Sequence, residues 1–185
     1  TSGSARNGGG AALMAAHGPR PETVEAYERA SRLAAETGEM EELSRARWGA
    51  WFCHMQRMDV PQQRAIIVDL LGRSDRVTDD SLTLQAHHAA WTTSWVIGDL
   101  AGMREHSEIG LRLYDQERHH EQTAYYGGHD AGVCCRYTLG LALWLLGVPD
   151  QAVARGEEAL GLARQLAHPL TLVICLSYVS WLRLM

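Results

Sequence analysis

The sequence contains no lysine, and all 17 of its basic residues are arginine. This absence excludes Schiff-base chemistry and the phosphate-binding lysine of a P-loop. The net charge is only −5, and acidic residues and arginines alternate along the chain instead of clustering. Because no basic stripe exists for a phosphate backbone to contact, nucleic-acid binding is not expected.

Signals for export or membrane insertion are also missing. Residues 1–10 are rich in glycine, serine and asparagine, so we expect a disordered segment and no signal peptide. Residues 169–185 are very apolar, but they include Arg183 and fall short of a membrane span. The four cysteines lack the spacing of a disulfide scaffold, which predicts a cytoplasmic protein with reduced thiols.

Metal-binding sequence motifs are absent as well. The sequence has no Cys-x-x-Cys, no His-Glu-x-x-His and no His-x-x-x-His. Zinc needs three or four converging ligands, whereas adjacent residues on a helix diverge by about 100°. We therefore predict no metal and no cofactor, although four pairs of candidate ligands occur: His87-His88, His119-His120, His129-Asp130 and Cys134-Cys135.

A thiol–imidazole pair is the remaining catalytic candidate, formed by Cys134 or Cys135 with His129. Both cysteines lie in the first turns of a predicted helix, a position that lowers the pKa of a thiol in principle. The adjacent Val133 and the helical register, however, place at least one of them in the core. We predict no catalytic residues and no enzymatic activity for this chain.

What the sequence does contain is a recurring tight turn between amphipathic stretches. Three such turns occur, with 40 residues from the first to the second and 49 from the second to the third. The step of 40 also relates Trp51 to Trp91. Similarity at such a period indicates an array whose units bury their apolar faces by stacking on each other. The three turns are Met58-Asp59, Gly98-Asp99 and Gly147-Val148.

The patterning favours an all-α fold. Apolar residues recur at helical spacing, and no alternating run of useful length indicates a strand. Pro21 opens a helix that stops at Gly38, the next helix is expected over 39–58, and Asp79 and Asp80 are N-cap candidates for a later one. We predict one domain over residues 11–185, a right-handed solenoid of antiparallel helix pairs with repeats of about 40 residues.

Helix pairs of this kind resemble the tetratricopeptide-like superfamily, with Leu146-Gly147 and Ala159 at matching positions. A second resemblance is to the C-terminal helical-repeat region of large bacterial signalling proteins, in which an adenylate/guanylate cyclase or Ser/Thr kinase domain precedes an AAA-type ATPase module. The matching segments are residues 10–14, 104–106, 110–115, 126–135, 143–147 and 149–152. The resemblance implies a non-catalytic regulatory or protein-protein interaction segment.

Two kinds of binding remain open from the sequence. The chain either binds a protein or peptide, including neighbouring domains of its own parent protein, or senses a small molecule in a concave groove. The extra nine residues of the second step fall within 115–130, and insertions in repeat proteins often form the binding face. This loop insertion is either a structural plug or a binding loop, with Asp130 also expected to cap the next helix. The candidate partner-binding residues are Arg118, His120, Tyr125, Tyr126, His129 and Asp130.

The C-terminal helix presents a further expectation. Its apolar residues exceed what one packed face needs, and terminal repeats normally carry a polar outer face. We therefore predict uncovered apolar surface and a homodimer formed through this helix. The residues expected to be uncovered are Leu172, Val173, Leu176, Val179 and Leu182.

Overall fold

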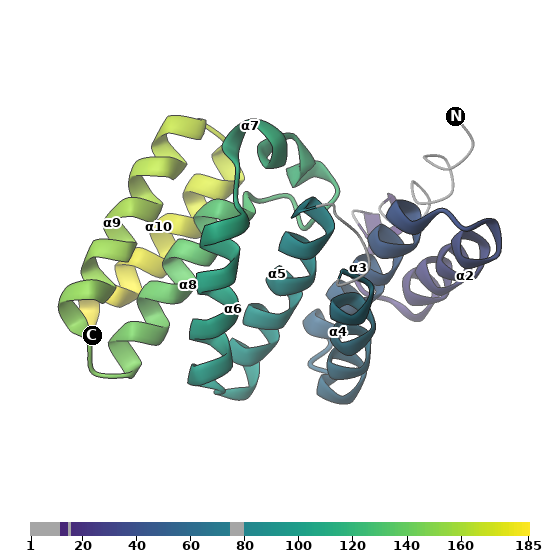
Figure 1. Cartoon of the computed structure of the whole chain (residues 1–185), viewed down its shortest axis with the longest axis horizontal. Coiled ribbons are helices and arrows are strands. Elements are labelled where there is room, and N and C mark those ends of the chain that lie inside the picture. The colour runs from purple at the N-terminus through teal and green to yellow at the C-terminus, as the bar shows by residue number, and fades with distance from the viewer. Residues whose placement is uncertain (1–11, 15, 75–79) are drawn as a thin grey trace. The chain divides into compact units, whose positions relative to one another are not determined.

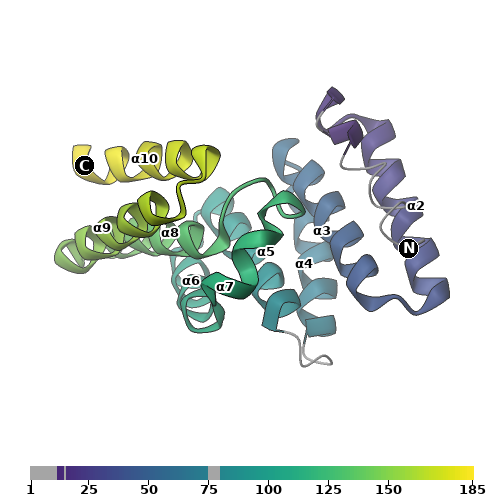
Figure 2. The ribbon, with the colours of Figure 1, turned by 90° about the horizontal axis from the view of Figure 1, so that it is seen from above.

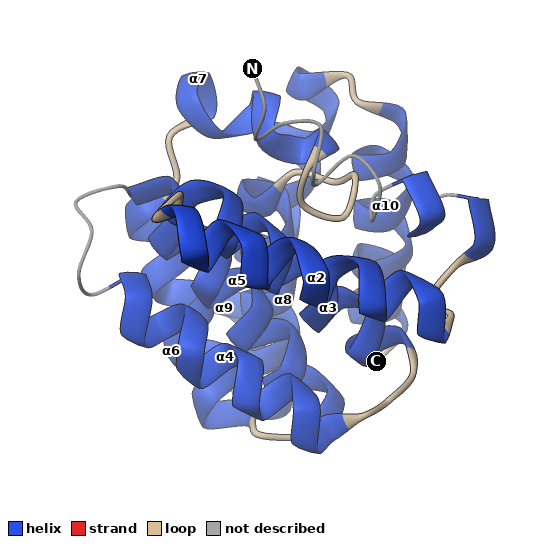
Figure 3. Ribbon diagram, turned by 90° about the vertical axis from the view of Figure 1, so that its right-hand side faces the viewer, coloured by secondary structure: helices blue, strands red, loops and turns tan. Residues whose placement is uncertain are grey.

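The computed structural model of the chain describes residues 12–14, 16–74 and 80–185 (Figure 1). These residues contain no strand, which confirms the predicted all-α class (Figure 3). The disorder predicted for residues 1–10 and the N-cap candidate Asp79 lie outside the described residues, and Asp80 is the first residue of its helix. The elements are α2 (Pro21–Thr37), α3 (Met40–Gln56), α4 (Val60–Ser74), α5 (Asp80–Ile97), α6 (Leu100–Leu113), α7 (Gln116–His119), the 3-10 helix η1 (His120–Ala124), α8 (Ala131–Leu145), α9 (Pro149–Leu166) and α10 (Pro169–Leu184).

The chain divides into two compact units, Thr1–Leu82 and Thr83–Met185. In the first unit α3 packs against both α2 and α4, and in the second α8 packs against α6, α9 and α10 (Figure 2). Helices that follow each other along the chain therefore lie side by side within each unit. The single domain, the solenoid and the 40-residue repeat stay predictions.

All three predicted turns have the same backbone geometry. Met58, Gly98 and Gly147 each adopt a left-handed conformation, with φ of 57°, 73° and 82°. In each turn the next amide donates a hydrogen bond to the carbonyl five residues earlier, from Asp59 to His54, Asp99 to Ser94 and Val148 to Leu143. These bonds satisfy carbonyls that the end of a helix leaves unpaired, so each turn closes one helix and directs the chain into the next.

The spacing of Trp48, Trp51, Met55 and Met58 predicts one inner face for the helix expected over 39–58, and in the first unit the tryptophans of α3 form that face. Trp48 and Trp51 are buried, and their rings lie 5.1 Å apart. Met58 was expected on the same face, but it is 62% exposed. That expectation is wrong because α3 ends at Gln56 and the left-handed turn directs Met58 away from the helix.

In the second unit, α8 is buried on almost every side. Val133 and Cys135 have no exposed surface, and Trp91 of α5 is equally buried in the same core. Ala142 is also fully buried, in a second core cluster. A helix surrounded by other helices needs apolar residues around its whole circumference, which explains the nearly continuous apolar sequence of α8.

Residues 115–130, predicted as a loop insertion, instead contain the two short helical segments α7 and η1. Asp115 starts α7, because its carboxylate accepts a hydrogen bond from the amide of Arg118 at 3.2 Å. Within this segment, the side chains of His119 and Tyr126 are buried. One side of it therefore packs on the helical core while the other is exposed.

The C-terminal helix α10 packs on α9 and α8 through one face only. Val179 and Leu182 are buried, which corrects the expectation that they would be uncovered, since they lie over Gly156 and Gly140 of the two neighbouring helices. Val173 and Leu176 are exposed as predicted. None of the described helices combines the length and the apolar character needed to cross a membrane.

Candidate functional site

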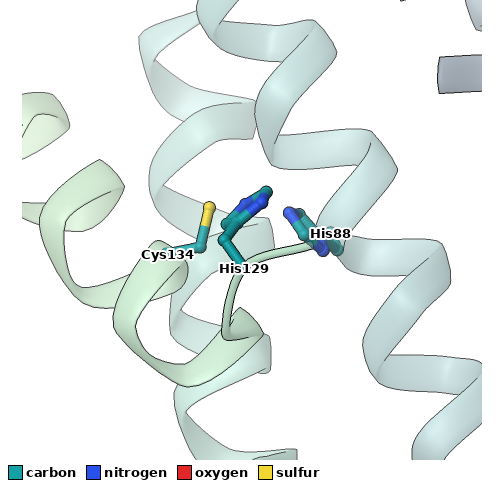
Figure 4. Close-up of side chains that lie close together, drawn as sticks. All are labelled: His88, His129 and Cys134. Carbon is teal, nitrogen blue, oxygen red and sulfur yellow. The ribbon is translucent and has the colours of Figure 1, made fainter. Parts of the chain in front are cut away.

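Two histidines and a cysteine from three different segments meet inside the second unit. His88 comes from the middle of α5, His129 from the loop that ends just before α8, and Cys134 from the first turns of α8. One ring nitrogen of each histidine and the cysteine Sγ all lie within 4.8 Å of one another (Figure 4). His88 and Cys134 are buried and His129 is partly buried, so the three form a cluster that is shielded from solvent.

The start of α8 positions two members of this cluster. The Asp130 carboxylate accepts a hydrogen bond from the amide of Val133 at 2.9 Å, which confirms the predicted N-cap. The amide of Asp130 itself donates to the Thr171 hydroxyl of α10 at 3.0 Å. Asp130 fixes the residue at which α8 begins. It therefore positions His129, which precedes the helix, and Cys134, which lies in its first turns.

Two further side chains make hydrogen-bond contacts with the second carboxylate oxygen of Asp130. The Tyr114 hydroxyl donates to it at 3.0 Å, and Nδ1 of His120 lies 3.1 Å away. Burial and the charge of Asp130 raise the pKa of Tyr114 well above its ordinary value, so this hydroxyl keeps its proton and remains a donor. Asp130 has no exposed surface, and its oxygens link the residue that follows α6 to η1 and to the start of α8.

Each imidazole of the cluster has an acceptor at Nδ1. Nδ1 of His88 lies 3.0 Å from Oε1 of Gln85, one turn earlier in α5, and Nδ1 of His129 lies 3.2 Å from the carbonyl of Gly127. A proton on Nδ1 donated to such an acceptor leaves the lone pair of the ring on Nε2. Both rings are thereby oriented by hydrogen bonds that do not involve the cysteine.

The sulfur of Cys134 accepts hydrogen bonds from two further side chains. The Trp91 indole donates at 3.4 Å and the Tyr137 hydroxyl at 3.0 Å. Burial opposes ionisation of this thiol, but the charge of His88 and hydrogen bonds from His129 and His88 lower the pKa of Cys134 well below its ordinary value. The same sulfur raises the pKa of His129 against the effect of burial, whereas burial lowers the pKa of His88. The donors around this sulfur therefore oppose the effect of burial on its ionisation.

The neighbouring residues of each pair point elsewhere, as the helical spacing predicts. The thiol of Cys135 donates to the carbonyl of Gly132 at 3.2 Å, and burial raises its pKa. Nδ1 of His87 lies 3.0 Å from Nδ1 of His106 in α6. Only one member of the Cys134-Cys135 pair and one of the His87-His88 pair thus belong to the cluster.

The six predicted partner-binding residues are divided between surface and interior. Arg118 is exposed and 58% of the Tyr125 surface is accessible, while His120 is partly buried. Tyr126 and Asp130 are buried, and His129 belongs to the cluster. A partner reaching this segment would contact Arg118 and Tyr125 first.

The sequence does not predict that these three residues meet. The sequence offers all three residues as candidate zinc ligands and pairs His129 with Cys134 or Cys135, but metal binding is rejected there because adjacent residues on a helix diverge. That argument is correct for neighbours but does not apply to single residues contributed by three segments. Among the described residues, His88, His129 and Cys134 are the group that could hold a metal ion. Access for a substrate is poor, since Cys134 is only 3% exposed.

Comparison with known proteins identifies a distant relative of the chain but does not place it in a family. No family model matches the chain. An uncharacterized protein of Rhizobium meliloti (strain 1021) is 29% identical over 121 residues, which is 65% of this chain and 12% of that protein. The chain therefore spans about an eighth of the length of the curated relative it matches.

Proposed function

We propose that this chain is a non-catalytic interaction segment of a larger cytoplasmic signalling protein, and that it binds an amphipathic helix of a protein partner along the outer face of α10. The observation that carries the proposal is a row of exposed apolar side chains on that helix. Its members are Leu170, Val173, Trp181 and Leu184, with exposures of 47%, 60%, 52% and 84%.

The row has the periodicity and length of a helix-binding surface. Its members recur at intervals that keep them on one side of α10, opposite the buried Cys175 and Val179. Ser177 and Ser180 lie between them, so no charge interrupts the row. At a rise of about 1.5 Å per residue it extends for roughly 21 Å, or nearly four helical turns.

A helix is the partner that fits this surface best. α10 already packs on α9, and α9 on α8, so another helix against α10 would continue the same side-by-side packing. Trp181 supplies a large aromatic contact of the type enriched where binding energy concentrates. The flank of the row is charged, because Arg183 pairs with Glu157 of α9, which would limit how the partner can be oriented.

The cytoplasmic part of the proposal is supported by the cysteines. All four are buried free thiols, as expected in a reducing compartment. A cyclase or kinase domain and an ATPase module in the parent protein remain part of the proposal, and so does the absence of catalysis in this segment. A partner helix could then come from a neighbouring domain of the same protein.

The test compares amide hydrogen exchange of α10 in the isolated chain and in the full-length parent protein. We expect slower exchange in the parent, and loss of that protection in Val173→Glu. Val153→Glu is the matched control, since Val153 is 44% exposed on α9. Equal exchange in both contexts would overturn the proposal. Protection that appears only in a concentration-dependent dimer of the isolated chain would assign the face to a second copy.

A further inference from the structure

We infer that His88, His129 and Cys134 form a zinc-binding site inside the second unit, with a water molecule as the fourth ligand. The inference is independent of the proposed function, because the cluster lies in the core around α8 and does not involve the exposed face of α10. It rests on the ligand types, their separation, the hydrogen bonds that orient them and the charge around them.

The three side chains are the ligand types that zinc prefers. Zinc binds imidazole nitrogen and thiolate sulfur, and sites with three protein ligands complete a tetrahedron with water. Three atoms at the corners of a triangle with 4.8 Å sides, the largest separation here, would lie about 2.8 Å from its centre. Zinc bonds of about 2.0–2.3 Å therefore require each ligand to move inward by less than about 1 Å, which small side-chain rotations can supply.

The surrounding hydrogen bonds match those of metal sites. A metal-bound histidine usually donates its second ring N–H to a carboxylate, a carbonyl or a water molecule, which sets the tautomer and directs the lone pair at the metal. Gln85 and the carbonyl of Gly127 accept from Nδ1 of His88 and His129 respectively. Because both rings are oriented in this way, the Nε2 lone pairs are the donors that a cation would use.

Hydrogen-bond donors surround the sulfur of Cys134. The Trp91 N–H and the Tyr137 O–H both donate hydrogen bonds to Sγ of Cys134. Donors of this kind around a coordinated sulfur tune its interaction with the metal. A buried cation also needs compensating charge. The Cys134 thiolate and the buried carboxylate of Asp130, the residue that follows His129, together balance Zn²⁺.

The competing interpretation is a thiolate–imidazolium pair without metal. It explains the contact between His129 and Cys134 but assigns no role to His88, which stacks on Trp91 with ring centroids 4.8 Å apart and meets the edge of His129 at 5.1 Å. Two imidazoles at one buried sulfur are more than an ion pair requires, since a single imidazolium balances one thiolate.

The test uses the purified 185-residue chain after removal of metal by a chelator. We expect one equivalent of Zn²⁺ to bind with an accompanying rise in melting temperature. Substitution by Co²⁺ should produce a thiolate-to-metal charge-transfer absorption band. Cys134→Ala should abolish that band, and Cys135→Ala is the matched control, because Cys135 is an adjacent buried thiol outside the cluster. Gln85→Leu should weaken zinc binding about 10- to 100-fold by removing the acceptor that orients His88.

Three results would overturn the inference. The first is a folded chain, by circular dichroism, that takes up no stoichiometric Zn²⁺ or Co²⁺. The second is a Co²⁺ spectrum that lacks the thiolate band, and the third is a band that survives in Cys134→Ala. If that variant does not fold, Cys134→Ser replaces it, and the band of the unsubstituted chain by itself still decides whether a thiolate binds the metal.

Discussion

Gly49 of α3 lies against the ring of Tyr27 of α2 so closely that no side chain fits between them. A Cβ atom at position 49 would lie 2.2 Å from Cε1 and 2.5 Å from Cζ of Tyr27. Tyr27 is itself buried and cannot move away freely. This contact sets how closely α2 and α3 approach in the first unit.

Gly49→Ala should therefore destabilise the first unit by about 1–3 kcal/mol, because the added methyl group overpacks a filled interface. Gly72→Ala is the matched control in α4, where a Cβ meets nothing within 4 Å. It should instead stabilise by up to about 1 kcal/mol through helix propensity. Urea denaturation of the two variants measures both effects, and equal changes would contradict the role assigned to the Gly49–Tyr27 contact.

Met58→Gly should stabilise the chain by about 0.5–1 kcal/mol. Met58 has φ of 57°, a conformation that costs a residue with a Cβ about 1 kcal/mol or more, and its exposed side chain contributes little packing. The matched control is Gly147→Ala, which introduces a Cβ at φ of 82° in the equivalent turn. That substitution should destabilise by about 1 kcal/mol. Thermal unfolding of both variants would show opposite shifts, whereas shifts of the same sign would contradict the turn argument.

Asp69→Asn should lower stability by about 1 kcal/mol at neutral pH. Asp69 joins α3 and α4 through hydrogen bonds from Arg47 and Arg73, each 2.8 Å long. Burial by itself raises the pKa of Asp69, but the two arginines outweigh it and hold the pKa below the ordinary value of 3.8. The stabilisation that Asp69 gains from the two arginines is therefore present above the pKa of Asp69 in the unfolded chain. It is lost as pH falls through the lower pKa of the folded chain.

The difference between Asp69→Asn and the unsubstituted chain should accordingly disappear in acid. Glu108→Gln provides the control, because the Arg104–Glu108 pair is exposed on α6 and such pairs contribute only about 0.3–0.5 kcal/mol. Urea titrations between neutral and strongly acidic pH measure the effect. A loss of stability that persists below both pKa values would show that Asp69 acts by packing alone.

Tyr125→Ala and Tyr126→Ala should separate the two sides of the 115–130 segment. Tyr125 is exposed, so its removal should change the free energy of unfolding by less than about 0.5 kcal/mol. Tyr126 is 3% exposed, and its removal should cost about 3–5 kcal/mol by leaving a cavity. Denaturation of both variants, with Arg118→Ala as a second surface control, checks this division. A large loss in Tyr125→Ala would make the whole segment a structural plug.

Helix ends and turns were predictable because their chemistry is local. Pro21 at a first turn, Asp130 as an N-cap and the glycines at positions 98 and 147 all act within a few residues of their own position. The sequence predicts both a turn at Met58 and a buried position on the helix face, and only the turn is confirmed, since spacing alone does not show where a helix stops. The two short helical segments in 115–130 were missed because segments of four and five residues have no detectable apolar period.

The cluster illustrates the limit of the sequence most directly. By itself the sequence determined the all-α class, the turn positions and the fact that only one of Cys134 and Cys135 can face a given point, because these follow from the geometry of a single helix. The tertiary structure alone decided that His88 of α5 meets His129 and Cys134, since 40 residues lie between His88 and His129 in the sequence. It likewise decided that α10 buries Val179 and leaves Val173 exposed. Both are equally apolar valines, and which one is covered depends on the neighbouring helices that the chain brings against them.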